Sequence, residues 1–202
     1  MSLFRQVARI ATLASVSLCL RFMFEVPLFP SAPYLKYDAG DIPVLIGAFA
    51  LGPEVGVAVA LVNSLVFLML RFSPETLVGE PMNFLAGATF AWCAGNLYFP
   101  NKTKLRAVLS LMAGGIVSTL AMVAANKLAL PFLTALFLPR AVQATWTEIL
   151  TVILPFNLVK AGLNGVLVFL VYKRISPALK AANWEQPARP RKTAPAGLPA
   201  AR

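Results

Sequence analysis

A long, nearly uncharged stretch constrains this chain more than any other feature. Residues 42–70 carry a single charged side chain, Glu54. About 20 apolar residues suffice for a helix to cross a bilayer. Over the whole chain 58% of residues are apolar and 13% are charged, whereas soluble domains average about 45–50% and about 25%. We therefore expect an all-α membrane protein, whose 202 residues allow about six helices and no sizeable soluble catalytic domain.

The composition also limits the chemistry that the chain can perform. Histidine is absent, so catalysis by histidine and metal or haem sites with histidine ligands are excluded. Cys19 and Cys93 are the two cysteines, too few for a four-cysteine zinc or iron–sulfur site. Both lie in apolar runs, and we interpret them as small buried side chains. The sequence thus predicts no enzyme, no catalytic residue, no metal and no cofactor.

The net charge of +10 is concentrated in a few segments. Clusters of Lys and Arg beside apolar helices are typical of loops that stay in the cytoplasm, so we expect a lipid bilayer and no nucleic acid as the partner of this charge. With six helices, all the basic clusters fall on one side of the membrane. The clusters are Arg5 and Arg9; Lys102, Lys104 and Arg106; and the C-terminal segment from Lys173 to Arg202.

Prolines, glycines and polar residues divide the apolar sequence into helices. The break Gly52-Pro53-Glu54 matches a helix end followed by a helix start, which makes the preceding helix too short to cross the membrane alone. We prefer a retained first helix to a cleaved signal peptide. The prediction is a six-helix transmembrane bundle (domain 1–175) with helices at 4–24, 42–51, 54–71, 81–99, 105–130 and 148–173, a long outer loop at 25–41, further outer loops at 72–80 and 132–147, and a disordered Pro/Ala-rich tail at 176–202.

Polar side chains inside apolar helices mark the candidate site, because such groups usually face a cavity or a partner. Asn157, Lys160 and Asn164 project from one stripe, within about 60° of one another. The alternative is a hydrogen-bonding stripe between helices, or a lysine that reaches the membrane surface. Asn126 on the fifth helix and Asn83 on the fourth also lie in outer halves. Together they predict an outward-facing polar pocket covered by the loop 25–41.

The acidic residues near helix starts are best interpreted as structural. Asp38 or Asp41 could accept a hydrogen bond from a ligand hydroxyl, but the simpler interpretation is that they cap the short second helix. Glu80 fits the start of a helix. We see no carboxylate pair at mid-membrane, which weakens the hypothesis of a proton-coupled carrier.

Three segments carry a family resemblance: LKYDAGDIPVLIGAFALGP (35–53), GEPMNFLAGATFAWCAG (79–95) and PFNLVKAGLNGVLVFLVYKRISP (155–177). They resemble the substrate-binding S components of energy-coupling factor (ECF) vitamin transporters, most closely the riboflavin-specific group. The resemblance implies a multi-pass protein of the bacterial cell membrane with cytoplasmic termini. It further implies a transmembrane coupling subunit and two cytoplasmic ATPase subunits as partners, and this chain itself contains no phosphate-binding loop.

The resemblance also implies which residues bind the vitamin. Asn126, Asn157 and Lys160 are the best matches, followed by Asn83, and Leu35 and its neighbours would cover the ligand together with Asp38. Lys127 departs from the family, where an aromatic residue is common. Another vitamin, flavin mononucleotide and a self-sufficient secondary carrier remain alternatives.

A strip of small side chains on the first helix is the candidate partner surface. Small residues at helical spacing let a second helix approach closely. The strip resembles the surface by which S components dock the coupling subunit, and the alternative is packing against helices of the same chain. Its members are Ala8, Ala11, Thr12 and Ser15.

Overall fold

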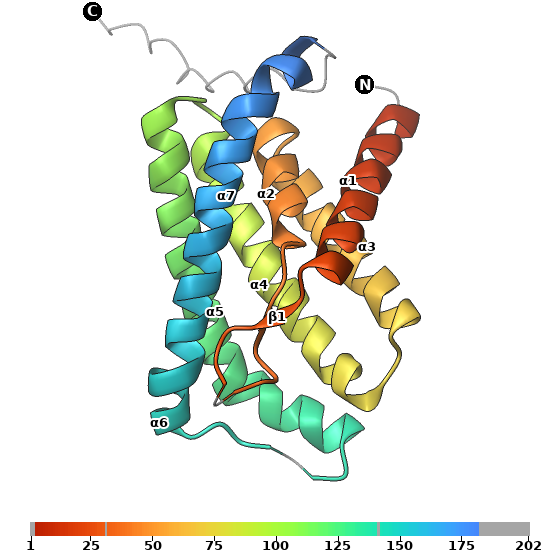
Figure 1. The fold of residues 1–202 in the computed structure, drawn as a ribbon, viewed down its shortest axis with the longest axis vertical. Coiled ribbons are helices and arrows are strands. Elements are labelled where there is room, and N and C mark those ends of the chain that lie inside the picture. The colour runs from red at the N-terminus through yellow and green to blue at the C-terminus, as the bar shows by residue number, and fades with distance from the viewer. Residues whose placement is uncertain (1–2, 31, 141, 182–202) are drawn as a thin grey trace, which may run out of the picture.

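The computed structural model describes residues 3–30, 32–140 and 142–181, which form a bundle of helices (Figure 1). A two-residue antiparallel strand pair follows the first helix, pairing Val26 with Tyr37 and Pro27 with Lys36. The elements in chain order are α1 (Leu3–Met23), β1 (Val26–Pro27), β2 (Lys36–Tyr37), α2 (Asp41–Ala50), α3 (Pro53–Leu70), α4 (Pro74–Tyr98), α5 (Lys104–Phe137), α6 (Trp146–Glu148), the π-helical segment η1 (Ile149–Ile153) and α7 (Leu154–Ala181).

Four helical stretches are long and apolar enough to cross a membrane: α1, α3, α5 and the continuous stretch Trp146–Arg174. The helix α2 has only 10 residues, and α4 has 25 residues but a more polar sequence. The expectation of an all-α membrane protein is therefore confirmed. The helix α7 reaches Ala181, and the rest of the expected tail, residues 182–202, lies outside the described residues.

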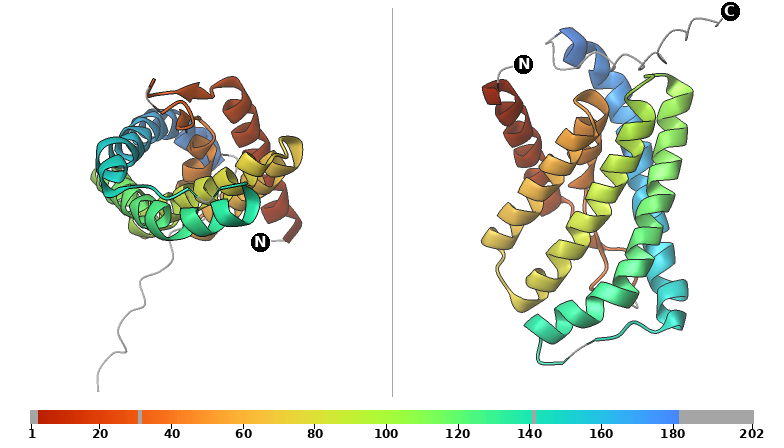
Figure 2. Two further views of the ribbon diagram at one scale, coloured as in Figure 1. Left: turned by 90° about the horizontal axis from the view of Figure 1, so that it is seen from below. Right: turned by 180° about the vertical axis from the view of Figure 1, so that it is seen from behind.

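The two ends of the bundle differ in chemistry (Figures 1 and 2). The start of α1, the α2–α3 turn, the α4–α5 loop and the end of α7 lie together at one end. We call it the basic end, because Arg5, Lys102, Lys104 and Lys173 lie there. The strand pair and the α3–α4 and α5–α6 connections lie at the opposite end, which we call the loop end. The sequence-based separation of basic segments from long loops thus matches the arrangement of the chain.

The short helix α2 lies at the centre of the bundle, as expected for a helix that cannot cross alone. All ten of its residues are buried, and it packs against α1, α3, α4 and α7. Gly52 makes the turn into α3 at φ +115°, a conformation that side chains with a Cβ rarely adopt. At Gly56 a Cβ would lie 2.6 Å from that of Ala48, so glycine allows α2 and α3 to touch along their backbones.

Two helix boundaries differ from the sequence-based prediction, and both involve proline. The helix α4 starts at Pro74, not at residue 81, so Pro81 lies inside it. Ser73 caps this helix by accepting a hydrogen bond from the Thr76 amide, a serine–proline start that the sequence does contain. The helix α5 continues through Pro131 to Phe137. Interior prolines are tolerated in membrane helices because neighbouring groups can satisfy the backbone that they free. Just after Pro131, the Thr134 hydroxyl donates to the carbonyls of Leu130 at 2.8 Å and Pro131 at 3.2 Å.

The start of the last helix is distorted where the sequence contains Pro155. Proline lacks the N–H that would continue the hydrogen-bond ladder. The π-helical segment η1 ends immediately before Leu154, whose amide bonds to the Ile149 carbonyl. Wider turns of this kind are frequent at functional sites. This one ends four residues before Asn157.

A buried ion pair attaches α1 to α4 at the loop end. Arg21 donates two hydrogen bonds to the Glu80 carboxylate, at 2.8 and 2.5 Å, and both side chains are less than 10% exposed. The guanidinium also lies 3.5 Å from the centre of the Phe67 ring. Glu80 therefore does not serve the helix start as the sequence suggested, because α4 begins six residues earlier. It neutralises a cation within the bundle.

We predict that Glu80→Gln lowers the free energy of unfolding by about 3–5 kcal/mol, because Arg21 then keeps a buried charge without its partner. Thermal unfolding in detergent, followed by circular dichroism, measures the change. Lys36→Gln is the matched control: its pair with Glu25 is longer, 3.3 Å, with the lysine 48% exposed, so the loss should stay below about 1 kcal/mol. Equal losses in both variants would contradict a structural role for the buried pair.

Candidate functional site

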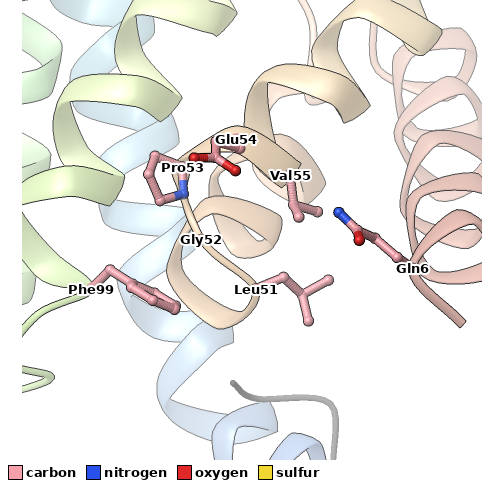
Figure 3. A pocket seen from close by; sticks show the side chains of 7 residues that line it. All are labelled: Gln6, Leu51, Gly52, Pro53, Glu54, Val55 and Phe99. Carbon is pink, nitrogen blue, oxygen red and sulfur yellow. The ribbon is translucent and has the colours of Figure 1, made fainter. Parts of the chain in front are cut away.

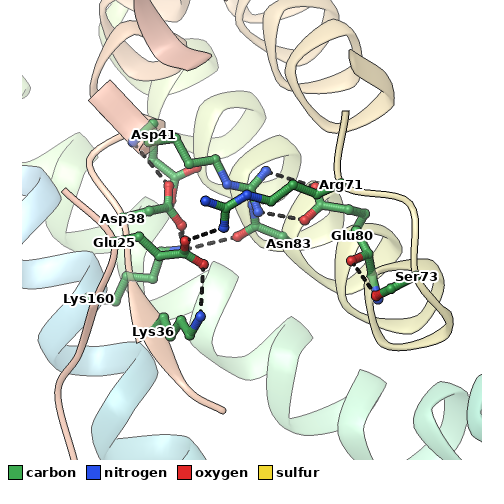
Figure 4. Close-up of polar contacts among 12 residues, drawn as sticks. Glu25, Lys36, Asp38, Asp41, Arg71, Ser73, Glu80, Asn83 and Lys160 are labelled. Carbon is green, nitrogen blue, oxygen red and sulfur yellow. Dashed lines mark hydrogen bonds and ion pairs between the residues drawn. The ribbon is translucent and has the colours of Figure 1, made fainter. Parts of the chain in front are cut away.

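The candidate site is a buried polar network around Lys160 (Figure 4). The Lys160 ammonium donates to Asn83 Oδ1 at 2.9 Å and to Asp38 Oδ2 at 3.2 Å, and lies 3.5 Å from Asp41 Oδ2. Lys160 is 7% exposed. These side chains come from α7, α4, α2 and the loop before α2. An ammonium this deep is tolerable only because carboxylates and an amide oxygen surround it.

Asn164 extends the network one turn along α7. Its amide nitrogen donates to Asp41 Oδ2 at 3.1 Å, and its oxygen accepts from the Tyr37 hydroxyl at 3.0 Å. The interpretation of Asp41 as a helix cap is therefore wrong: Gly40 precedes α2, no side chain caps that helix, and Asp41 points into the network. Asp38 instead accepts from the Gly40 amide at 3.0 Å and so holds the chain at the entry to α2.

Asn126 and Asn157 lie apart from the Lys160 hydrogen bonds but show the same local geometry. Each is more than nine-tenths buried and donates to the carbonyl four residues earlier, Met122 for Asn126 and Ile153 for Asn157, at 2.8 Å. Within the described chain their amide oxygens accept no hydrogen bond. Each side chain thus keeps an acceptor and one N–H for a ligand.

The loop between α1 and α2 lies along α7. Tyr34 donates to Glu148 at 2.8 Å, Phe29 meets the edge of the Phe156 ring with centres 6.2 Å apart, and Tyr37 and Asp38 reach Asn164 and Lys160. Burial and the bond to Glu148 raise the pKa of Tyr34 to about 12, so the phenol remains a donor at neutral pH. The backbone of Leu35 is fixed by a 3.0 Å bond to the Ala32 carbonyl. These contacts hold the loop over the site.

Sequence reasoning named several residues of this polar network but not the way its carboxylates meet. It identified Asn83, Asn126, Asn157, Lys160 and Asp38, and three of these, Lys160, Asn83 and Asp38, are joined directly. It did not predict that Asp38 and Asp41 would meet as a buried pair at Lys160. The available signal was charge balance: two cations within apolar helices, Arg21 and Lys160, require nearby carboxylates.

Apolar side chains form the surroundings in which these polar groups act. Met82 and Ala86 of α4 pack with Met122 and Ala125 of α5, next to Asn83 and Asn126 in sequence. Pairs of donors and acceptors set among apolar walls are typical of pockets for flat, partly polar ligands. Lys127, the residue that departs from the family, donates to the Ala144 carbonyl at 3.3 Å and lies 5.2 Å from the Trp146 ring centre.

Two hollows lie at the basic end of the bundle. The first is a cavity of about 190 Å³ between α1 and the α2–α3 turn, where Gln6, Glu54 and Phe99 surround Gly52 (Figure 3). The second, about 250 Å³, lies between the α4–α5 loop and α7. Neither includes a residue of the Lys160 network.

The small side chains of α1 face away from the bundle. The two hydroxyls bond to carbonyls of their own helix, from Thr12 to Ala8 and from Ser15 to Ala11, at 2.9 Å each, so the strip exposes little polarity. Cys19 is also exposed and Cys93 is half-buried, which corrects the expectation that both are buried. Packing against helices of the same chain is therefore not the role of this strip. All four members, Ala8, Ala11, Thr12 and Ser15, are exposed.

Comparison with known families and proteins gives consistent results. Residues 5–172 match the family model described as "ECF transporter, substrate-specific component". The riboflavin transporter RibU of Streptococcus thermophilus is 31% identical over 179 residues, covering 87% of this chain and 84% of that protein. RibU of Staphylococcus aureus is also 31% identical over 179 residues, covering 87% and 93%. The riboflavin transporter FmnP of Bacillus subtilis is 30% identical over 176 residues, covering 85% and 90%.

One solved structure has the same fold. It is described as "Structure and mechanism of the S component of a bacterial ECF transporter", and it aligns with a TM-score of 0.73 at 28% identity. The alignment covers 89% of this chain and 99% of that chain. The similarity therefore extends over most of the bundle.

Proposed function

Because this chain belongs to the family of ECF transporter substrate-specific components, we propose that it binds riboflavin and passes it to an ATP-driven importer. The observation that carries this proposal is the buried Lys160 ammonium, reached by the covering loop and by two other helices. Its relatives are named riboflavin transporters. The chain performs no chemistry on the vitamin and needs no cofactor, since the ligand itself is the cargo.

The chemistry of riboflavin fits the groups that the site offers. The flavin ring is flat and largely apolar, with an imide edge that alternates acceptors and a donor. Asn126 and Asn157 each keep an acceptor and a donor for such an edge. The Lys160 ammonium can donate to a ring carbonyl or to a ribityl oxygen, with Asn83 and Asp38 holding it in position. The apolar cluster of α4 and α5 suits the faces of the ring. Its members are Met82, Ala86, Met122 and Ala125.

The loop between α1 and α2 acts as the lid of this site. Its residues 32–38 contact Glu148 of α6 and Lys160 and Asn164 of α7, so entry of a ligand from the loop end requires these contacts to open. Leu35 and Asp38 then close over the bound ring. A ligand that adds contacts to the closed state shifts the equilibrium towards it.

The chemistry of the two ends supports the orientation that we propose, and the family supports the partners. The helices α2 and α4 complete a six-helix membrane bundle, and the basic end with both termini faces the cytoplasm of a bacterial cell. A transmembrane coupling subunit docks on the exposed strip of α1, and two ATPase subunits supply the energy. In this proposal the domain 1–175 binds the vitamin.

For the binding residues, we expect Asn157→Ala and Lys160→Ala each to weaken riboflavin binding by about 1–3 kcal/mol, because a buried polar group of the ligand loses its partner. Quenching of flavin fluorescence measures the affinity. Lys104→Ala serves as a control, since this exposed lysine lies at the basic end, opposite the site. Unchanged affinity in both site variants would reject the assignment.

For the lid, riboflavin should slow trypsin cleavage after Lys36, an exposed lysine in the loop. Tyr34→Phe removes the hydrogen bond to Glu148 and should speed cleavage a few-fold without ligand. Mass spectrometry of the fragments follows the rate, and cleavage after Lys104, at the opposite end, is the internal control. Equal rates with and without riboflavin would mean that the loop does not gate the site.

For the partner surface, Ala11→Trp or Ser15→Trp should abolish co-purification with the coupling subunit and leave riboflavin affinity unchanged. A bulky side chain on the strip keeps a partner helix at a distance, while the exposed position spares the bundle. Val16→Trp, an exposed position beside the strip, is the matched control. Loss of riboflavin binding together with assembly would assign the strip to internal structure and refute docking.

A further inference from the structure

The second hollow at the basic end has a chemistry that the transport of a neutral vitamin does not require. Three lysines line it: Lys102 of the α4–α5 loop, Lys104 of α5 and Lys173 of α7. Among the described residues that line it, none is acidic. Three cations around one cavity of about 250 Å³ repel one another, and a bound anion would relieve that repulsion.

The start of α5 adds to the positive potential of this cavity. The first turn of a helix carries a partial positive charge, where acidic residues are favourable and basic residues are not. In α5 the first turn contains no acidic residue, and it carries Lys104 and Arg106 instead. Thr103 and Lys104, the cap and the first residue of the helix, both line the cavity. The local sequence is thus unfavourable for the helix alone and favourable for an anion beside it.

The floor of the cavity is rigid. Phe49, Tyr98 and Tyr172 form a buried aromatic cluster whose ring centres lie 4.1 to 5.9 Å apart. All three are less than 10% exposed. A preformed floor lowers the entropy cost of holding a ligand.

Rows of exposed apolar side chains run along α5 and α7 from the cavity towards the middle of the bundle. On α7, Phe169 lines the cavity, and Val166 and Leu170, at helical spacing from Phe169 and Lys173, are 60% and 55% exposed. On α5, Val108 and Met112 follow Lys104 at intervals of four residues and are 39% and 61% exposed. A ligand with a charged head and long apolar chains fits this combination better than a small soluble anion does.

We propose that this cavity binds the phosphate headgroup of an anionic phospholipid from the cytoplasmic leaflet. The phosphate lies among Lys102, Lys104 and Lys173 at the start of α5, and the acyl chains follow the exposed apolar side chains of α5 and α7. Basic pockets at the cytoplasmic ends of membrane helices are suited to such headgroups. The lipid would join the α4–α5 loop to α7 at the end opposite the vitamin site.

The test compares lipid binding to the purified full chain in detergent. Native mass spectrometry counts bound lipids during titration with anionic dioleoyl phosphatidylglycerol or zwitterionic dioleoyl phosphatidylcholine, which have the same acyl chains and differ in the headgroup. We expect Lys104→Gln/Lys173→Gln to weaken phosphatidylglycerol binding about 25-fold, about fivefold for each lysine, and to leave phosphatidylcholine unaffected. Arg5→Gln/Arg140→Gln removes the same net charge away from the cavity and should change the affinity less than twofold.

Three results would overturn the proposal. Equal losses in both double variants would mean diffuse attraction by net charge, and an unchanged affinity in the lysine variant would place the lipid elsewhere. Inorganic phosphate is a further arm: if it displaces phosphatidylglycerol completely at millimolar concentration, the site belongs to a soluble anion. Circular dichroism verifies folding, and the single lysine variants replace the double variant if it unfolds. None of these measurements depends on the identity of the vitamin.

Discussion

The ammonium of Lys160, buried inside a membrane bundle, is the constraint around which the loop end is organised. A charge at this position needs carboxylates and amide oxygens close by. Asp38, Asp41 and Asn83 supply them, and to do so they bring together the covering loop, α2, α4 and α7. Asn164 and Tyr37 then complete the network. The same interactions that make the charge tolerable thereby position a donor where a ligand carbonyl can meet it.

The Arg21–Glu80 pair serves the first helix in a comparable way. Only 17% of the residues in the 18-residue apolar stretch of α1 are buried, because α1 packs on α2 and α3 along one side. The ion pair attaches the C-terminal end of α1 to α4. The lid begins directly after this end of α1. The remaining surface of α1 stays open, and its small side chains are available to a partner. A helix fixed at one face and one end can thus present the other face without loosening the site.

Local sequence patterns predicted the helices. They failed at positions whose role depends on residues far away in the sequence. The stripe of Asn157, Lys160 and Asn164 follows from helical periodicity alone, and all three side chains are buried as one face of α7. Pro81 and Pro131 were expected to limit helices, because a proline breaks a helix in water. In the bundle both helices continue through their prolines, as membrane helices can when surrounding groups make up for the lost backbone bond. Asp41 lies where the sequence suggests a helix cap. Its carboxylate instead accepts a hydrogen bond from Asn164 and pairs with Lys160, both of α7.

What the sequence by itself determined is the set of apolar helices, the basic end, the short central helix and the polar stripe, because each depends on composition or on spacing within one segment. What only the tertiary structure decided is which charges meet. Arg21 and Glu80 lie 59 positions apart, and Lys160 and Asp38 lie 122 apart. No spacing rule connects such residues. Their pairing follows from the packing of α1, α2, α4 and α7, and from the free energy that an unpaired charge would cost inside that packing.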